Sequence, residues 1–110
     1  MMDEHDFRKK CDAALEDLRK RLLEVGDAHD FEVEGEGEKL ELQFEDAEET
    51  RFVISPNTAA RQIWISALAT SFKLGWSDSA GAFVLDKTGE TLSQVMGRVL
   101  TQQLGTAVEV

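Results

Sequence analysis

The chain has 110 residues, a length typical of one domain. Its 22 acidic residues outnumber 12 basic ones, and the net charge of −10 disfavours nucleic-acid binding, because Lys and Arg drive contacts to phosphates. Cations or a basic protein surface are the partners that this charge favours.

The composition also bears on the compartment. No apolar run approaches the roughly 20 residues of a membrane span, and the acidic N-terminal stretch lacks the apolar segment of a signal peptide. The single cysteine, Cys11, cannot form an internal disulfide, which agrees with a reducing compartment. We therefore expect a cytoplasmic protein that does not contact a membrane.

Residues 4–25 have the periodicity of an amphipathic helix. Apolar side chains recur at three- and four-residue spacing, namely Phe7, Cys11, Leu15, Leu18, Leu22 and Val25. Asp3 is placed to cap the start of the helix, and Gly26 suits its C-terminal cap. The polar face mixes both signs of charge and predicts three ion pairs at i,i+4 spacing, which are Asp6–Lys10, Glu16–Lys20 and Asp17–Arg21.

Six short segments then read as β-strands, most of them because apolar and polar side chains alternate. We expect strands at about 30–34, 39–45, 51–55, 61–67, 71–76 and 82–86. Residues 35–38 are expected to form a hairpin turn and residues 46–50 a polar turn. Pro56 is expected to end the third strand, because proline cannot donate to a ladder.

The chain returns to helical periodicity over about residues 91–104. Thr91 and Gln94 have the spacing of a capping box. Gly97 would weaken an isolated helix, so it is expected to mark close packing. The tail 105–110 begins with a glycine that suits a helix end and contains two valines that are expected to cover the core.

The element order is therefore helix, strand meander, helix. Because every strand is half polar, the sheet buries one face only, and the two helices must cover that face. We predict a single α+β domain over 1–110, a two-layer sandwich with two helices packed on one face of an antiparallel sheet of about six strands.

The alternation in residues 62–66 places a tryptophan on the open face of this sheet. If Ile63 and Ile65 point into the core, then Trp64 points the other way. A large aromatic side chain facing water is informative, since tryptophan is enriched in the centres of protein interfaces. The alternatives are that Trp64 is covered by a neighbouring loop or fills a cross-strand position.

Carboxylates are concentrated before the central strands. Residues 27–49 contain eleven acids and one base, Lys39. Asp30, Glu32 and Glu34 share one strand face at spacings of about 6.5–7 Å, and carboxylate oxygens suit hard cations. Nothing fixes six ligands around one ion, so we expect weak, partly hydrated sites. The alternative is a solvated strand face that discourages edge pairing.

Other candidate metal ligands lie in and after the first helix. Asp3, Glu4 and Asp6 rank below the strand acids, because capping and the helix dipole explain acids in a first turn. Asp27 joins the candidates from the acid-rich stretch. His5 and His29 are isolated and read more simply as surface residues.

No catalytic constellation is visible. The chain contains no CxxC, HExxH, GxSxG or phosphate-loop pattern. Cys11 lies on the apolar stripe and is expected to be a buried filler without a partner for nucleophilic chemistry. We expect no catalytic residues and no organic cofactor.

Residues 52–67, centred on Gln62-Ile63-Trp64-Ile65-Ser66, resemble the signature of the frataxin family, bacterial CyaY type. The resemblance extends over nearly the whole chain, through Phe7, Asp12, Leu15 and Leu18, residues 30–34 and 39–45, and Trp76, Asp86, Gly89 and Leu92. Two departures stand out. Arg19 and Lys20 occupy positions where several bacterial members have acids, and Ala60 replaces an asparagine of mitochondrial members.

The resemblance implies a small protein of iron–sulfur cluster biogenesis. Family members bind ferrous and ferric iron weakly through surface carboxylates and contact the cysteine desulfurase and the scaffold protein, often as a brake in bacteria. Carried onto this chain, the resemblance implies iron binding along Asp30, Glu32 and Glu34. It implies partner contacts at Gln62 and Trp64, and we add Ser66, which shares their strand face.

Three functions stay open from the sequence. The first is a monomeric, non-enzymatic modulator of cluster assembly that docks on the desulfurase–scaffold complex and binds Fe2+ or Fe3+ weakly. The second is a ferroxidase or iron-storage particle that oligomerises with iron. The third is an acidic, metal-independent module that mimics nucleic acid and occupies a basic protein site.

Overall fold

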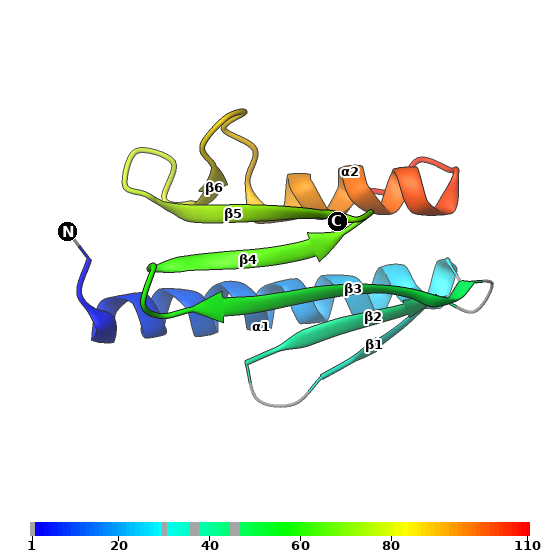
Figure 1. The fold of residues 1–110 in the computed structure, drawn as a ribbon, viewed down its shortest axis with the longest axis horizontal. Helices are drawn as coiled ribbons and strands as arrows, with labels where there is room; N and C mark the ends of the chain where they lie inside the picture. Colours follow the sequence, from blue (N-terminus) through cyan, green and yellow to red (C-terminus); the bar gives the residue numbers. More distant parts are fainter. Residues whose placement is uncertain (1, 30, 36–37, 45–46) are drawn as a thin grey trace.

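A computed structural model describes residues 2–29, 31–35, 38–44 and 47–110, the side chains of 47–49 excepted. Along the chain, one helix is followed by a meander of strands and then by a second helix (Figure 1). They are α1 (Glu4–Ala28), β1 (Phe31–Glu34), β2 (Leu40–Phe44), β3 (Ala47–Asn57), β4 (Gln62–Ala67), β5 (Thr70–Ser77), β6 (Ala82–Leu85) and α2 (Leu92–Leu104).

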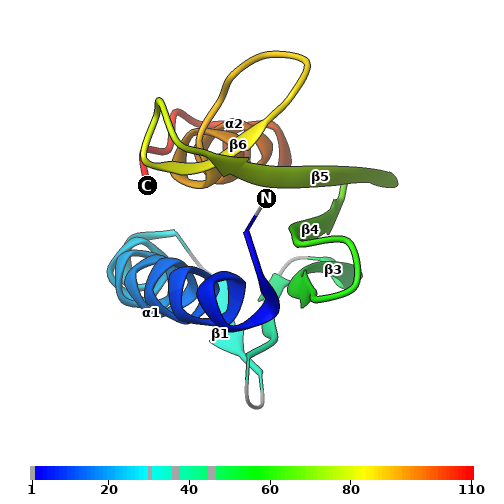
Figure 2. The same ribbon diagram turned by 90° about the vertical axis from the view of Figure 1, so that its left-hand side faces the viewer.

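The strands form one antiparallel sheet in sequence order, from β1 at one edge to β6 at the other. Figure 2 shows α1 and α2 on the same side of this sheet, which leaves the opposite face open. The predicted α+β sandwich is confirmed. Neither helix in the described part of the chain is long and apolar enough to span a bilayer.

The core lies between the helices and the covered face of the sheet. Every second residue of the central strands points into it, as the alternation predicts. The fully buried side chains include Phe7, Leu18 and Leu22 from α1, Leu42, Phe52, Ile54, Ile63, Ile65 and Leu74 from the sheet, and Val95, Met96 and Leu100 from α2. The Phe83 ring packs edge-on against Phe7 and Trp76, with centroid distances of 5.9 and 5.3 Å.

The first helix is longer than predicted. We expected it to end at residue 25 with Gly26 as the cap, but α1 continues to Ala28 and is capped by His29, whose N–H donates to the Gly26 carbonyl at 3.3 Å. Gly26 has another role. A Cβ there would lie 2.9 Å from the Phe31 carbonyl oxygen, so the glycine lets the start of β1 approach the helix.

The third strand is longer than predicted at both ends. Instead of a polar turn to residue 50, β3 begins at Ala47, while 45 and 46 lie outside the described residues. Instead of ending before Pro56, the strand continues, and Pro56 pairs with Ile63 of β4. The pairing of β2 with β3 reaches only to Ile54, so Pro56 sits where β3 has a neighbour on one side and its missing N–H is tolerated.

The second helix matches its predicted signals. Thr91 and Gln94 form a capping box, and Gly105 adopts the left-handed conformation with φ of 71°. A Cβ on Gly97 would lie 3.2 Å from the Val108 carbonyl oxygen, so the glycine does mark close packing, against the C-terminal tail. Val108 is buried, and its N–H donates to the Thr101 hydroxyl at 3.0 Å.

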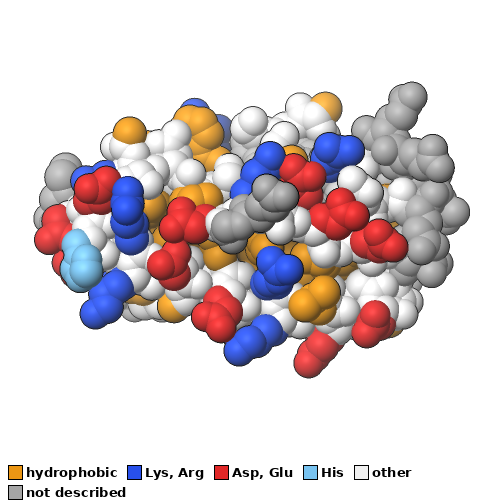
Figure 3. All heavy atoms as spheres, turned by 90° about the horizontal axis from the view of Figure 1, so that it is seen from below, with side chains coloured by type: hydrophobic (Ala, Val, Ile, Leu, Met, Phe, Trp, Pro, Cys, Tyr) orange, Lys and Arg blue, Asp and Glu red, His pale blue; other side chains and the backbone are white. Residues whose placement is uncertain are grey.

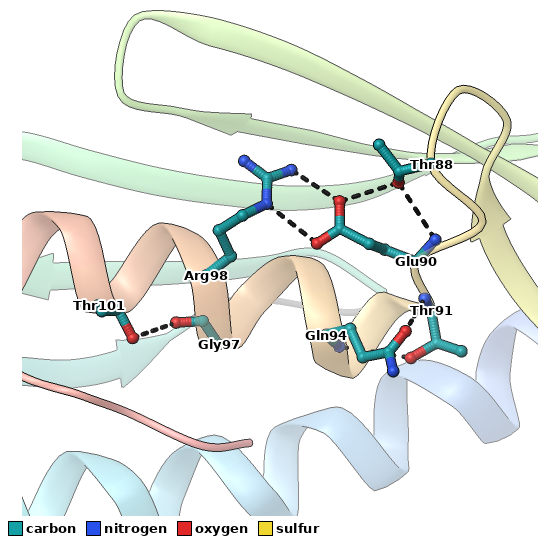
Figure 4. A network of polar contacts seen from close by, with 7 residues as sticks. All are labelled: Thr88, Glu90, Thr91, Gln94, Gly97, Arg98 and Thr101. Carbon is teal, nitrogen blue, oxygen red and sulfur yellow. Dashed lines mark hydrogen bonds and ion pairs between the residues drawn. The ribbon is translucent and has the colours of Figure 1, made fainter.

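A polar network ties α2 to the loop that precedes it (Figure 4). Arg98 donates from Nε and Nη2 to the two carboxylate oxygens of Glu90, both at 3.0 Å, and the Thr88 hydroxyl donates to the same carboxylate at 2.9 Å. These bonds hold the pKa of Glu90 below its usual range. The Arg98 guanidinium also lies 5.4 Å from the Phe72 ring centroid and so covers part of β5.

Two of the three ion pairs predicted along α1 form. Glu16 lies 3.8 Å from Lys20, and Asp17 lies 2.9 Å from Arg21. The predicted Asp6–Lys10 pair is wrong, because the Lys10 ammonium turns to the Trp76 ring instead, 5.1 Å from its centroid. A large quadrupolar ring within reach competes with an exposed carboxylate, whose ion pairs are weak in water.

Candidate functional site

Trp64 lies on the open face of the sheet, at its centre. Its neighbours Ile63 and Ile65 are buried in the core, so the indole between them faces away from the helices. Trp64 pairs with Ser55 of β3 and Lys73 of β5. The side chain is half-buried. Gln62 and Lys73 contact the indole, and the Trp64 ring makes no aromatic stacking contact with other described residues.

The indole is held by polar groups at its edge and over its ring. Its Nε1–H donates to the Gln62 Oε1 at 2.9 Å, and the Lys73 ammonium lies 4.8 Å from the ring centroid. Because the polar tip is satisfied while much of the ring stays accessible, the residue suits a contact that is partly apolar and partly polar. Gln62 is half-buried and Ser66 is exposed on the same strand face. The three predicted contact residues therefore lie side by side.

Cations on this face were missed from the sequence. Lys73 and Arg51 both point to the open side, in register with Trp64 and with Gln43 respectively. Alternation in 70–77 puts Lys73 on the same face as Ser71 and Gly75, which was a usable signal. Lys73 consequently places one cation beside Trp64, whereas Arg51 lies farther along β3 and pairs with Glu41.

Acidic side chains occupy the β1–β2 end of the same face. Glu32 and Glu34 are exposed on β1, and Glu34 lies directly opposite Glu41 of β2 in the strand register. Glu41 is already engaged, because the Lys39 ammonium lies 2.9 Å from its carboxylate and the Arg51 guanidinium 3.8 Å away. The hydrogen bond from Lys39 lowers the pKa of Glu41. Glu32 and Glu34 are thus the β1 candidates for cation binding, while Asp30 lies outside the described residues.

The helix candidates fall into two separate groups. Asp3 caps α1 and accepts from the Asp6 N–H at 2.8 Å, and Glu4 pairs with Arg8 at 3.3 Å. Asp27 lies in the last turn of the helix. A helix of 25 residues is about 37 Å long, so Asp27 is near β1 and far from the other three.

The predicted metal ligands therefore do not converge on one point. Within residues 2–29, 31–35, 38–44 and 50–110, no group of three or more His, Cys, Asp or Glu side chains is placed to hold an ion together. Acidic and basic side chains are interspersed on the face that carries α1, β1 and β2 (Figure 3). Any cation held by these carboxylates would keep much of its hydration shell.

Cys11 is a packing residue, as predicted. Its side chain is buried in the core cluster. Burial, with smaller contributions from Glu38 and Asp12, raises the pKa of the thiol to about 12. The thiolate needed for nucleophilic or metal chemistry is therefore strongly disfavoured near neutral pH.

Comparisons with known proteins agree with this architecture. A family model described as a frataxin-like domain matches residues 1–106. Relatives named iron-sulfur cluster assembly protein CyaY include those of Azotobacter vinelandii, 25% identical over 97 residues and 86% of each chain, and Dechloromonas aromatica, 28% identical over 108 residues and 97% of each chain. A solved frataxin structure from Psychromonas ingrahamii superposes with a TM-score of 0.75 over 98% of this chain and 97% of that one. At 18% identity, that likeness shows the fold alone.

Proposed function

The chain belongs to the frataxin-like family, and on that premise we propose that it acts in iron–sulfur cluster assembly as a non-enzymatic modulator. Relatives that align over most of their length carry the name iron-sulfur cluster assembly protein, which supports the general role. The finer proposal is that it docks on a complex of the cysteine desulfurase and the scaffold protein in the cytoplasm.

The Trp64 face carries the proposal for docking. A half-buried indole with a satisfied N–H, flanked by an amide and hydroxyls, resembles the centre of a protein interface more than an ordinary solvated strand. Gln62 and Ser66 supply hydrogen-bonding groups beside it. Lys73 must either pair with an acidic group of the partner or move off the ring on docking.

The acidic residues carry the proposal for iron, as cargo rather than as a resident cofactor. Hard oxygen ligands on an exposed strand suit Fe2+ and Fe3+. We propose weak binding centred on Glu32 and Glu34, with Asp27 nearby and Asp30 added from the sequence pattern. A second, weaker site is proposed at the start of α1, with Asp3, Glu4 and Asp6 as its ligands. No organic cofactor is proposed.

Desulfurase activity measured with and without this protein, and with and without Fe(II), tests the role directly. A change in rate that saturates with protein concentration supports the modulator. Rates that stay equal at all concentrations contradict it. The sign of the change distinguishes a brake from an activator.

Iron-dependent behaviour separates the alternatives. The modulator stays a monomer in size-exclusion chromatography when Fe(II) is added, whereas a ferroxidase or storage particle forms oligomers and speeds Fe(II) oxidation. An iron titration followed by NMR distinguishes the third alternative. Shifts of the Glu32 and Glu34 amides support a metal-binding modulator, and their absence favours a metal-independent acidic module.

A further inference from the structure

Two cavities meet at Lys10 and Trp76, at the end of the molecule where the N-terminus of α1 lies beside the β3–β4 and β5–β6 loops (Figure 1). The larger cavity has a volume of about 660 Å3 and lies toward the loops. The smaller one, about 330 Å3, lies between α1 and the start of α2. Lys10 and Trp76 line both cavities, so their side chains form the wall between them.

The larger cavity offers an aromatic ring and carboxylates. Trp76 donates its Nε1–H to the Asp78 carboxylate at 2.9 Å, and Asp6 lines the same space. A ring with a carboxylate at its edge and another nearby favours a cation over its face. The cation found there is the chain's own Lys10. Arg61, also in the lining, is turned to its own loop and donates to the Thr58 carbonyl.

The smaller cavity is mainly apolar and accepts a different kind of side chain. Ala14, Ala82 and Leu92 contribute to its walls, and Asp17 lies at its edge. Small side chains on α1 and β6 leave the space that larger residues would fill. If the Lys10 side chain moved into solvent, the two cavities would join into one groove along α1. Its acidic end would be formed by Asp6 and Asp78 and its apolar end by the smaller cavity, where Asp17 is already paired with Arg21.

We propose that this groove binds a basic segment of a partner protein. A Lys or Arg side chain of the segment replaces Lys10 over the Trp76 ring, and a neighbouring apolar side chain enters the smaller cavity. The argument is one of charge complementarity. The carboxylates of Asp6 and Asp78 line the larger cavity with Lys10 and Arg61, Arg61 is turned to its own loop, and a cation already occupies the position over the ring. The proposal goes beyond the docking role of Trp64, which lies on the other face of the sheet from α1.

Lys10 competes with the ligand in this scheme. Binding of the segment exchanges one cation–ring contact for another. The free energy of the Lys10–Trp76 contact is therefore subtracted from the binding free energy. A cation–ring contact at an exposed site is expected to change binding by about three- to fivefold. Removing the Lys10 charge should therefore tighten binding by about that factor.

NMR titration of the full-length chain with short capped peptides tests the proposal. The chain has two tryptophans, so Trp64 supplies an internal reference signal for Trp76. The first peptide contains one arginine and one leucine. A second replaces arginine by citrulline, which keeps the shape and removes the charge, and a third replaces it by glutamate. The arginine peptide should shift the Trp76 indole signal and leave that of Trp64 in place, with the citrulline peptide several-fold weaker.

Two variants and a matched control complete the design. Lys10→Met should bind the arginine peptide about three- to fivefold more tightly, whereas Lys9→Met, which makes the same charge change one residue away, should not. Asp78→Asn keeps an oxygen acceptor for the indole N–H and should weaken binding about threefold. The proposal is overturned if no peptide shifts Trp76, if the glutamate peptide binds as well as the arginine peptide, or if Lys10→Met and Lys9→Met bind alike.

Discussion

The Lys73 ammonium lies 4.8 Å from the centroid of the Trp64 ring, and the two residues face each other across the β4–β5 pair. With the Gln62 amide at the indole N–H, this contact holds the side chain in one orientation before any partner arrives. An ordered side chain loses less entropy on binding than a mobile one. The open face therefore presents an indole whose orientation is fixed by two polar neighbours.

The Lys73–Trp64 contact should be measurable as a coupling in stability. We expect a double-mutant cycle with Lys73→Met and Trp64→Leu to give about 0.5–1 kcal/mol, because the pair is partly exposed and screened by water. Urea unfolding of the four proteins provides the measurement. If the two single changes add within error, Lys73 is a bystander and the ring is held in another way.

The Glu90–Arg98 pair should make stability depend on pH. The pKa of Glu90 is lowered in the folded state. The contribution of the pair to the unfolding free energy is therefore present above the unfolded pKa of about 4.3 and is lost as the pH falls through the folded pKa. At pH 7 we expect Glu90→Gln to lower the unfolding free energy by about 1 kcal/mol, since two charge-assisted bonds are lost from a partly exposed site.

Unfolding curves at pH 7 and at about pH 3.5 test this pair, and the gap between the wild type and Glu90→Gln should shrink at the lower pH. The control is Glu4→Gln, which breaks the more exposed pair with Arg8 and should change stability by only a few tenths of a kcal/mol. An equal loss of unfolding free energy in both variants would show that Glu90 affects stability through the net charge of the protein and not through its pair with Arg98.

Thr101 should hold the C-terminal tail on α2. Its hydroxyl donates to the Gly97 carbonyl at 2.8 Å and accepts from the Val108 N–H at 3.0 Å. Thr101→Val keeps the shape and removes both bonds, so we expect a loss of about 1 kcal/mol. Hydrogen exchange at the Val108 amide should accelerate in the same variant. Thr101→Ser retains the hydroxyl and should keep Val108 protected. Slow exchange in Thr101→Val would place the anchor of the tail elsewhere.

The β4–β5 turn contains strain that a glycine would relieve. Leu68 and Ala69 have φ values of 53° and 58°, a region that side chains other than glycine and asparagine rarely adopt. We expect Ala69→Gly to raise the free energy of unfolding by about 0.5–1 kcal/mol in thermal or urea unfolding. Ala59→Gly should lower it, because Ala59 itself does not adopt a positive φ, although Arg61 in the same loop does. A loss in both variants would mean that the Ala69 side chain contributes packing.

The alternation of apolar and polar residues predicted which side chains of each strand face the helices. It does so because a shift of one residue would turn all the apolar side chains of a strand to the solvent. That is why the positions of Ile63, Trp64 and Ile65 follow from five letters of sequence. Local sequence signals failed where a neighbouring strand determines where an element ends. Gly26 looks like a helix end but accommodates the start of β1, and Pro56 looks like a strand end but lies beyond the reach of β2.

The site was predicted less completely than the fold. The three residues of β4 that we predict to contact a partner lie together on one strand face, but the cation over Trp64 comes from β5 and depends on register between strands. Glu41 is one of the eleven acids in residues 27–49, and the Lys39 and Arg51 side chains converge on it. The contacts of Arg51 with Glu41 and of Lys73 with Trp64 depend on side-chain reach from one strand to the next, which sequence spacing does not encode.

Binding of the desulfurase–scaffold complex by the Trp64→Ala variant tests the central claim most directly. The matched control is Leu23→Ala, which truncates an exposed apolar side chain on α1, away from the open face. We predict that Trp64→Ala raises the dissociation constant at least about tenfold, as loss of an interface anchor does, while Leu23→Ala leaves it unchanged. Equal affinities for wild type and a folded Trp64→Ala protein would contradict docking through this face.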